Sequence, residues 1–119
     1  MLELKKPFET IFVILVVALA TPAYAGCDEA AKSGVDWNDC DKSGADLEGA
    51  DLSYADLRRV NFDNANLKGV NFVGARLMRS TMLGANVSDA TFDGAHLSGV
   101  VWIDGTKCGF YSVGGCTNN

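Results

Sequence analysis

The chain has 119 residues, of which 48% are hydrophobic and 21% are charged, and its net charge at pH 7 is −5. This length suits one small domain. The excess of acidic residues argues against nucleic acid as a partner, because phosphate binding requires clustered positive charge.

The first element is a secretory signal peptide, which the sequence predicts over residues 1–25. Lys5 and Lys6 precede an unbroken apolar stretch at residues 11–20, and Ala23-Tyr24-Ala25 supplies a small-residue cleavage site. The apolar stretch is about half the roughly 20 residues that a membrane-spanning helix needs. We therefore expect cleavage after Ala25, no membrane span in the mature protein, and a secreted or periplasmic location.

Cys27 lies two residues beyond the cleavage site and opens an alternative, a lipoprotein anchored at this cysteine. A lipid-modified cysteine usually follows a Leu-x-Ala or Leu-x-Gly pattern, and here Tyr24 stands where the leucine would be. The prediction is therefore an unlipidated chain that begins at Gly26.

Residues 26–44 are predicted to form an N-terminal cap. They contain two degenerate copies of the repeat that follows, Val35-Asp36-Trp37 and Cys40-Asp41-Lys42. Lys42 would occupy a position that is apolar in every later copy, and a lysine cannot be buried there without a partner. We therefore expect the regular core to start at Leu47.

From Ala45 to Asp104 the sequence divides into twelve five-residue units without a gap. The third residue of every unit, its centre, is apolar, the first is small or valine, and the second is mostly Asp, Asn or Thr. A helix would scatter such centres around its surface, and a continuous strand, whose period is two, would turn alternate centres outward. The pattern instead predicts a short strand with its first and third residues inward, followed by a corner at the fifth residue. Six of these fifth residues are glycines, which tolerate the positive φ of a corner.

These tandem Ala-Asp/Asn-Leu-x-Gly units resemble the pentapeptide-repeat proteins. The resemblance implies an all-β fold, a right-handed quadrilateral parallel β-helix in which four units make one coil of twenty residues. About three full coils would stand between disulfide-bonded end caps, the second cap being residues 105–119. The coils would be residues 45–64, 65–84 and 85–104. Centres twenty residues apart should then touch, such as Leu52, Phe72 and Phe92.

Four cysteines lie outside the coils, Cys27 and Cys40 before them and Cys108 and Cys116 after them. An even number in a secreted chain indicates disulfides. A bond between the two ends would have to span the stack, beyond the limit of about 7 Å on Cα separation across a disulfide. We therefore predict the local pairs, Cys27 with Cys40 and Cys108 with Cys116. A zinc site with His96 is the alternative, but the sequence has no Cys-x-x-Cys spacing.

No catalytic residue, cofactor site or metal site is predicted. The aspartates at second positions would face outward, where we interpret them as a solvated surface. The three coils carry net charges of −3, +3 and −3 in chain order. Opposite charges should therefore stack in register, with Glu48 over Lys68 and Asp56 over Arg76.

Four arginines form a candidate partner patch on one side of the expected spiral: Arg58, Arg59, Arg76 and Arg79. Arg59 would lie over Arg79, although stacked like charges cost stability, and both occupy corners where Gly or Asx would turn more easily. Stacked like charges and unfavourable corner residues therefore coincide at one place, which marks a candidate functional site for an acidic partner. The alternative is that the long side chains splay into solvent at little cost.

The function favoured by these features is a secreted or periplasmic, non-catalytic scaffold that binds a protein or an anionic surface. The partner and the oligomeric state are left open. A second function comes from relatives, because some pentapeptide-repeat proteins resemble DNA, occupy the DNA site of gyrase and protect it from drugs. The signal peptide, the short solenoid and the basic middle coil oppose that function here.

Overall fold

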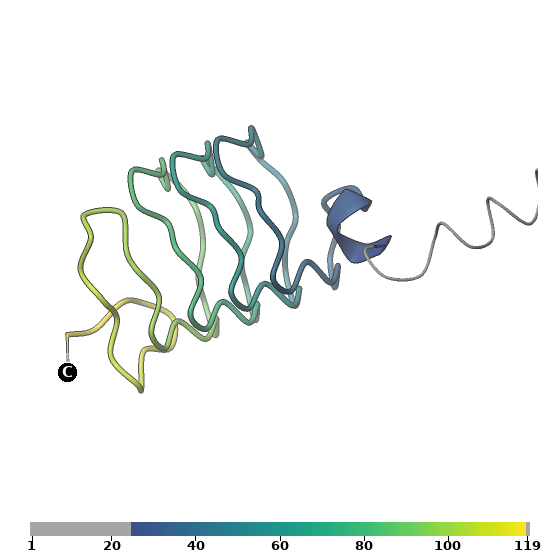
Figure 1. Ribbon diagram of the computed structural model, residues 1–119. Coiled ribbons are helices and arrows are strands. Elements are labelled where there is room, and N and C mark those ends of the chain that lie inside the picture. Colours follow the sequence, from purple (N-terminus) through teal and green to yellow (C-terminus); the bar gives the residue numbers. More distant parts are fainter. Residues whose placement is uncertain (1–24, 119) are drawn as a thin grey trace, which may run out of the picture.

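The computed structural model describes residues 25–118, so the predicted signal peptide lies outside the described residues except for Ala25. One short 3₁₀ helix, η1 (Ala25–Asp28), opens this part, and the chain then winds as a spiral until its last residues fold back at the C-terminal end (Figure 1). Its turns are joined by isolated β-bridges. Residues 25–118 contain no strand that is longer than a single bridge residue. No helix in residues 25–118 is long and apolar enough to cross a membrane.

The spiral repeats every twenty residues and is four-sided. Parallel bridges join each paired residue to the one twenty positions later, from Asp36↔Asp56 through to Thr81↔Val101. Corners follow the five-residue period, because every fifth residue from Gly34 to Gly99 has φ between +56° and +75°. The predicted corner positions are therefore confirmed. Those that are not glycine are Asp39, Tyr54, Arg59, Asn64, Arg79 and Asp89.

Asp and Asn at second positions do more than form a solvated surface, which corrects the interpretation from sequence. Their Oδ1 accepts a hydrogen bond from the backbone N–H two residues later, at 3.0 Å from Asn38 to Asp36 and at 2.8 Å from Asp63 to Asn61. The same bond recurs at Asp41, Asp46, Asp51, Asp56, Asn66, Asn71 and Asn86. It fixes the start of each corner, as an Asx turn does.

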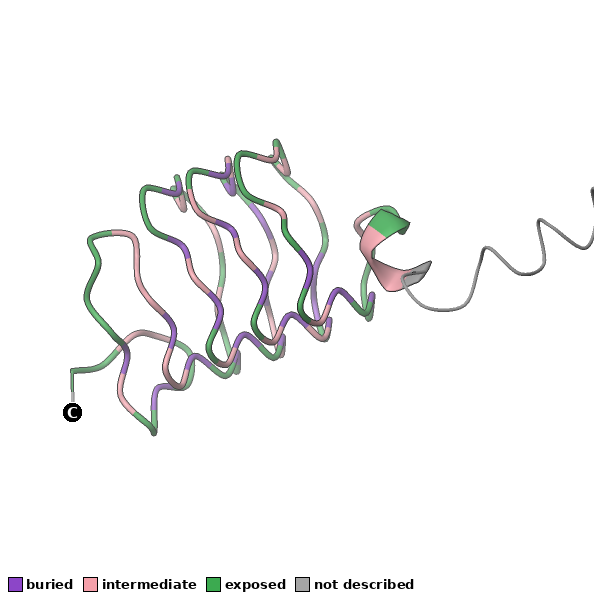
Figure 2. Ribbon diagram, viewed as in Figure 1, coloured by how far each residue is buried: buried purple, intermediate pink, exposed green. Residues whose placement is uncertain are grey.

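The hydrophobic core fills the inside of the spiral, where buried positions alternate with outward-facing ones (Figure 2). Centres in the middle of the spiral, such as Leu57, Phe62 and Leu77, are 0% exposed. The rings of Phe72 and Phe92 stack with centroids 5.0 Å apart, which confirms the expected contact between centres twenty residues apart. Each turn therefore buries its apolar side chains against the next.

The spiral begins earlier than the sequence predicts. Asp36 and Asp41 already form bridges to the following turn, and Val35 and Trp37 are each 1% exposed. Residues 35–44 therefore belong to the β-helix, and the expected start of the core at Leu47 is wrong.

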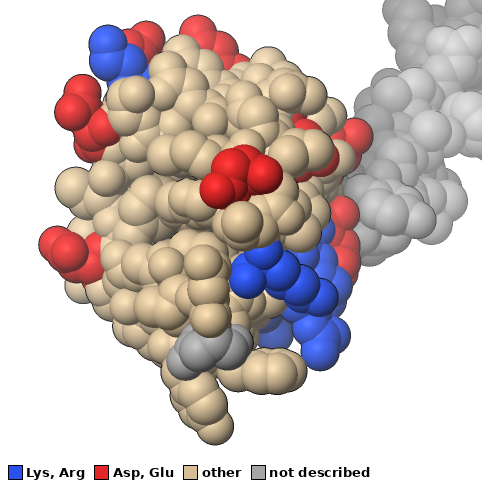
Figure 3. Space-filling model, turned by 90° about the vertical axis from the view of Figure 1, so that its left-hand side faces the viewer, with Lys and Arg blue, Asp and Glu red and all other residues tan. Residues whose placement is uncertain are grey.

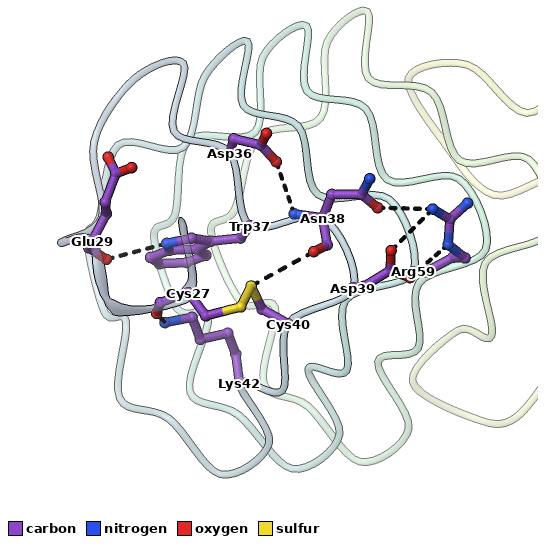
Figure 4. Close-up of a disulfide and its surroundings, with 9 residues drawn as sticks. All are labelled: Cys27, Glu29, Asp36, Trp37, Asn38, Asp39, Cys40, Lys42 and Arg59. Carbon is purple, nitrogen blue, oxygen red and sulfur yellow. Dashed lines mark hydrogen bonds and ion pairs between the residues drawn. A yellow bond between two sulfur atoms is a disulfide. The ribbon is translucent and has the colours of Figure 1, made fainter. Parts of the chain in front are cut away.

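Lys42 does occupy a centre position, and the structure supplies the partner that the sequence did not reveal. Its Nζ donates to the Cys27 carbonyl oxygen at 2.7 Å and lies 4.0 Å from the centroid of the Trp37 ring. The disulfide between Cys27 and Cys40, with Cα atoms 5.5 Å apart, holds that carbonyl in place (Figure 4). The lysine is therefore paired rather than buried alone.

At the other end the last predicted unit departs from the pattern. The positive φ lies at Gly105 instead of Asp104, and the chain reverses so that Val101 pairs antiparallel with Lys107 and His96 with Val113. Residues 105–118, the C-terminal cap, thus fold back over residues 95–104. The cap contains the second predicted disulfide, Cys108–Cys116, with Cα atoms 5.0 Å apart. Both predicted pairings are present in the structure.

Candidate binding site

The four arginines of the predicted patch are on one side of the spiral, but three of them are paired with acids. Arg58 donates to Asp56 of its own turn, from Nε to Oδ1 at 2.8 Å and from Nη2 to Oδ2 at 2.7 Å. Arg76, one turn later, reaches the same carboxylate at 3.3 Å, as predicted. The bond from Arg58 is the main cause that holds the pKa of Asp56 below its usual range. The other predicted stack, Glu48 with Lys68, forms no ion pair in the described part of the chain.

Arg59 pairs with the preceding turn rather than lying against Arg79. Its Nε and Nη2 donate to the Asp39 carboxylate at 2.6 and 3.1 Å, and Nη2 also donates to Asn38 Oδ1 at 3.1 Å (Figure 4). The hydrogen bond lowers the pKa of Asp39 and raises that of Arg59. The like-charge stacking expected from the sequence is therefore relieved, because Asp39 lies in register one turn earlier.

Arg79 is the exception among the four. Its side chain forms no ion pair or hydrogen bond with any residue from 25 to 118, and it is exposed. The residue twenty positions earlier is Arg59 and the one twenty positions later is Gly99, so no acid lies in register with it. Arg79 also holds a φ of 64°, a conformation that favours glycine. The guanidinium of Arg79 is therefore available to a ligand.

Arg79 lines a groove of about 770 Å³ beside the C-terminal cap. The groove also contains Met78 from the same turn and Lys107 and Phe110 from the cap. Ser98 Oγ donates a hydrogen bond to the Phe110 carbonyl, which ties the cap loop to the last turn of the spiral. The Phe110 side chain is 84% exposed.

Lys107, like Arg79, forms no ion pair or side-chain hydrogen bond in the described part of the chain. Figure 3 looks onto the C-terminal end and shows the largest group of Lys and Arg side chains on one side of it; a smaller basic group lies on the opposite side, and Asp and Glu side chains lie around the rim and next to the larger group. No acidic residue among residues 25–118 lines the groove. The local charge is therefore positive although the chain as a whole is acidic.

Sequence reasoning found Arg79 but missed Lys107 and Phe110. Both lie in the cap, outside the repeat. The five-residue register therefore does not predict which side of the spiral these residues contact. The one available signal was that Lys107 is the only charged residue after Asp104.

The groove suits an anionic group next to an apolar one. A guanidinium presents a planar fork that matches a carboxylate, and Arg, Met and aromatic residues are enriched in the cores of protein interfaces. No group of three or more His, Cys, Asp and Glu side chains that could hold a metal occurs in residues 25–118. His96, the only histidine, is exposed on the outside of the spiral.

Three solved structures resemble this chain. A pentapeptide repeat protein from the thylakoid lumen of Arabidopsis thaliana is 30% identical with a TM-score of 0.59, over 71% of this chain and 64% of that protein. HetL of the cyanobacterium Nostoc, involved in the regulation of heterocyst differentiation, is 28% identical with a TM-score of 0.38, over 63% and 39%. A pentapeptide repeat protein from the cyanobacterium Cyanothece is 34% identical with a TM-score of 0.37, over 64% and 57%. The chain spans less than two thirds of the length of each.

Comparison with curated proteins gives no match. The sequence pattern described as "Pentapeptide repeats" matches residues 33–64 and 61–99, in eight copies. The match begins before Ala45, in agreement with the bridges that start at Asp36. Proteins with this repeat form right-handed β-helices, and the spiral of residues 35–104 has the twenty-residue register of that architecture. The chain belongs to the pentapeptide-repeat family.

Proposed function

We propose that this protein is a secreted or periplasmic, non-catalytic pentapeptide-repeat scaffold of about three coils. It binds a partner protein at the groove formed by Met78, Arg79, Lys107 and Phe110. The partner presents an acidic side chain next to an apolar one, the acid pairing with the two cations and the apolar group packing on Met78 and Phe110.

The observation that carries this proposal is the contrast between Arg59 and Arg79. Both are arginines at corners with positive φ, and both bear the backbone strain of that conformation. The Arg59 side chain forms an ion pair with Asp39 that offsets this strain, whereas the Arg79 side chain has no partner within residues 25–118. A strained backbone conformation that no side-chain interaction compensates points to a role in binding.

The proposed location rests on the cysteines and on one relative. All four cysteines are paired, which favours an oxidising compartment. The Arabidopsis protein is from the thylakoid lumen, which is also outside the stroma and cytosol. The DNA-mimic alternative requires a continuous acidic face, and the unpaired cations Arg79 and Lys107 oppose it.

Binding can be tested with a labelled random copolymer of glutamate and tyrosine, which offers acidic and aromatic groups on one chain. Fluorescence anisotropy should show binding that weakens as salt is added, because part of the attraction is between exposed charges. Arg79→Gly should weaken binding several-fold. The matched control is Arg59→Gly, which changes the same corner one turn earlier and should weaken binding less.

Two further probes separate the partner classes. Stronger binding of heparin than of the copolymer would replace the protein partner with an acidic polysaccharide, and binding only to vesicles containing anionic lipid would replace it with a membrane surface. If Arg79→Gly and Arg59→Gly bind the copolymer as the unmodified protein does, the groove is not the binding site.

A further inference from the structure

We propose that the groove binds a phosphate monoester, so that the acidic side chain of the partner protein is a phosphorylated one. This inference rests on the proposed function and specifies its anionic group, which carries a charge of about −1.5 to −2 at pH 7. Four donors would hold the phosphate: the Arg79 guanidinium, the Lys107 ammonium, and the backbone N–H groups of Met78 and Ser98.

The two cations of the groove converge on one glycine. A Cβ built on Gly99 would lie 3.5 Å from Arg79 Cγ and 4.0 Å from Lys107 Cε. Neither side chain forms an ion pair or a hydrogen bond with a residue from 25 to 118. Like charges held close together cost stability unless an anion neutralises them. A phosphate dianion neutralises both cations, whereas a single carboxylate leaves one positive charge over.

The backbone adds two donors, because the acceptor that binds them elsewhere in the spiral is missing beside the groove. In most units a second-position Asp or Asn accepts the N–H of the fourth residue, as described above. The second positions before Met78 and Ser98 are Arg76 and His96 instead. The N–H groups of Met78 and Ser98 therefore form no hydrogen bond with any residue from 25 to 118. Both residues line the groove.

The spacing of these two N–H groups suits one oxyanion. Met78 and Ser98 belong to adjacent turns, which the Arg76↔His96 bridge joins, so their backbones are about 4.8 Å apart. Both N–H groups point to the outer side of the spiral, where a second-position acceptor would stand. They can therefore donate to different oxygens of the same anion, and bonds from N–H groups to a charged oxygen are strong. A phosphate monoester has three such oxygens, which leaves acceptors for the guanidinium fork and the ammonium.

The apolar part of the groove favours a protein as the source of the phosphate. Met78 and Phe110 line the groove together with the cations, and a phosphorylated residue in a peptide brings neighbouring apolar side chains to them. Inorganic phosphate would use only the polar donors. We therefore expect it to bind more weakly than a phosphorylated peptide.

Three labelled peptides that differ in one side chain test the class of anion. Each places phenylalanine next to phosphotyrosine, sulfotyrosine or glutamate, and fluorescence anisotropy in phosphate-free buffer measures the Kd. The sulfate ester has the same tetrahedral shape with one negative charge, so it isolates the effect of the second charge. We expect the phosphotyrosine peptide to bind several-fold more tightly than either of the others, and inorganic phosphate to displace it only at high concentration.

His96→Asn tests the backbone donors. An asparagine at this position should accept the Ser98 N–H, as Asn61 and Asn86 accept the N–H two residues later in their own units. At pH 8 the exchange alters no charge. The matched control is His96→Gln, whose longer side chain does not form this turn. His96→Asn should weaken binding of the phosphotyrosine peptide by roughly three- to tenfold, and His96→Gln should leave it nearly unchanged.

Gly99→Asp tests the cations, because its carboxylate would lie between Arg79 and Lys107 and neutralise them from within the chain. Aspartate tolerates the φ of 73° at Gly99, as Asp39 and Asp89 do at equivalent corners. The matched control is Gly99→Asn, which has the same shape and no charge. Binding should be lost in Gly99→Asp and kept in Gly99→Asn, with circular dichroism showing that both variants are folded.

The outcomes separate this inference from the proposed function. If the glutamate or sulfotyrosine peptide binds as tightly as the phosphotyrosine peptide, the inference is wrong, while the proposed acidic partner stands. If His96→Asn and Gly99→Asp bind the phosphotyrosine peptide as their controls do, these donors do not hold the phosphate and the inference is again wrong. If neither the peptides nor the glutamate–tyrosine copolymer binds, both proposals fail.

Discussion

Replacing Arg79 with glycine should stabilise the protein, whereas the same change at Arg59 should not. Arg79 holds φ at 64° and has no side-chain partner in the described part of the chain. A non-glycine residue in this region costs about 1–2 kcal/mol of stability. Glycine removes this cost, but it also gives the unfolded chain more conformational freedom, which lowers the gain by roughly 0.5–1 kcal/mol. The net gain is about 0.5–1 kcal/mol, which raises Tm by roughly 2–8 °C in a domain of this size.

Arg59 has nearly the same backbone angle, 58°, so its replacement relieves the same strain. It also removes the ion pair with Asp39 and the hydrogen bond to Asn38. We therefore expect Arg59→Gly to have a lower Tm than Arg79→Gly at pH 7. Because Asp39 has a lowered pKa in the folded protein, its ion pair stabilises the fold above the ordinary aspartate pKa and is lost as the pH falls through the lowered value. The difference between the two variants should therefore shrink as the pH is lowered from about 4 toward 2.

Thermal unfolding followed by circular dichroism, on both variants and the unmodified protein, measures these differences. The reasoning is refuted if Arg79→Gly lowers Tm at neutral pH, or if the gap between the variants is unchanged in acid. The first result would mean that the Arg79 side chain stabilises the fold by packing, and the second that the Asp39 ion pair contributes nothing to stability.

Other predictions concern the ends, the core and the pH dependence. Intact-mass measurement of the exported protein should give a chain that starts at Gly26, and a diacylglyceryl mass on Cys27 would show a lipoprotein instead. Peptide mapping without reductant should recover both cap disulfides, and reducing each should cost about 2–3 kcal/mol of stability; free thiols would contradict the structure. Phe72→Ala should destabilise the fold by about 3–5 kcal/mol in denaturant titrations, more than Phe92→Ala, because Phe92 is already partly exposed. Stability should fall as the pH drops through the lowered pKa of Asp56, and Asp56→Asn, which keeps the turn hydrogen bond but loses two ion pairs, should flatten that dependence.

The repeat could be predicted because each of its positions restricts residue type for a local reason. A corner such as Gly69 requires positive φ, and a centre such as Leu67 must be apolar because it points inward. Both requirements recur every five residues, so the period itself determines the register. The register also correctly placed Asp56 beside Arg76.

The errors arose where the fold is completed by groups outside the repeat. Lys42 is stabilised by the backbone carbonyl of Cys27. Such an acceptor could not be predicted, because every residue has a backbone carbonyl and the side-chain pattern does not indicate which one is used. Treating the first units as a cap also removed Asp39 from the register, which hid the partner of Arg59. The groove could not be predicted because Lys107 and Phe110 reach it through a chain reversal at Gly105 that breaks the period.

The hydrogen bond from second-position oxygens to the backbone has a consequence for how such proteins diverge. Asn61 and Asp36 make the same bond, although one is neutral and the other is charged. Exchanging Asp for Asn at these positions therefore alters the electrostatic surface one charge at a time while each corner keeps its acceptor. Selection for binding to a partner can thus change the surface potential on one side of the spiral without altering the turns of the backbone. Closely similar backbones in this family can accordingly carry opposite surface charges, and a shared shape is a poor guide to a shared partner.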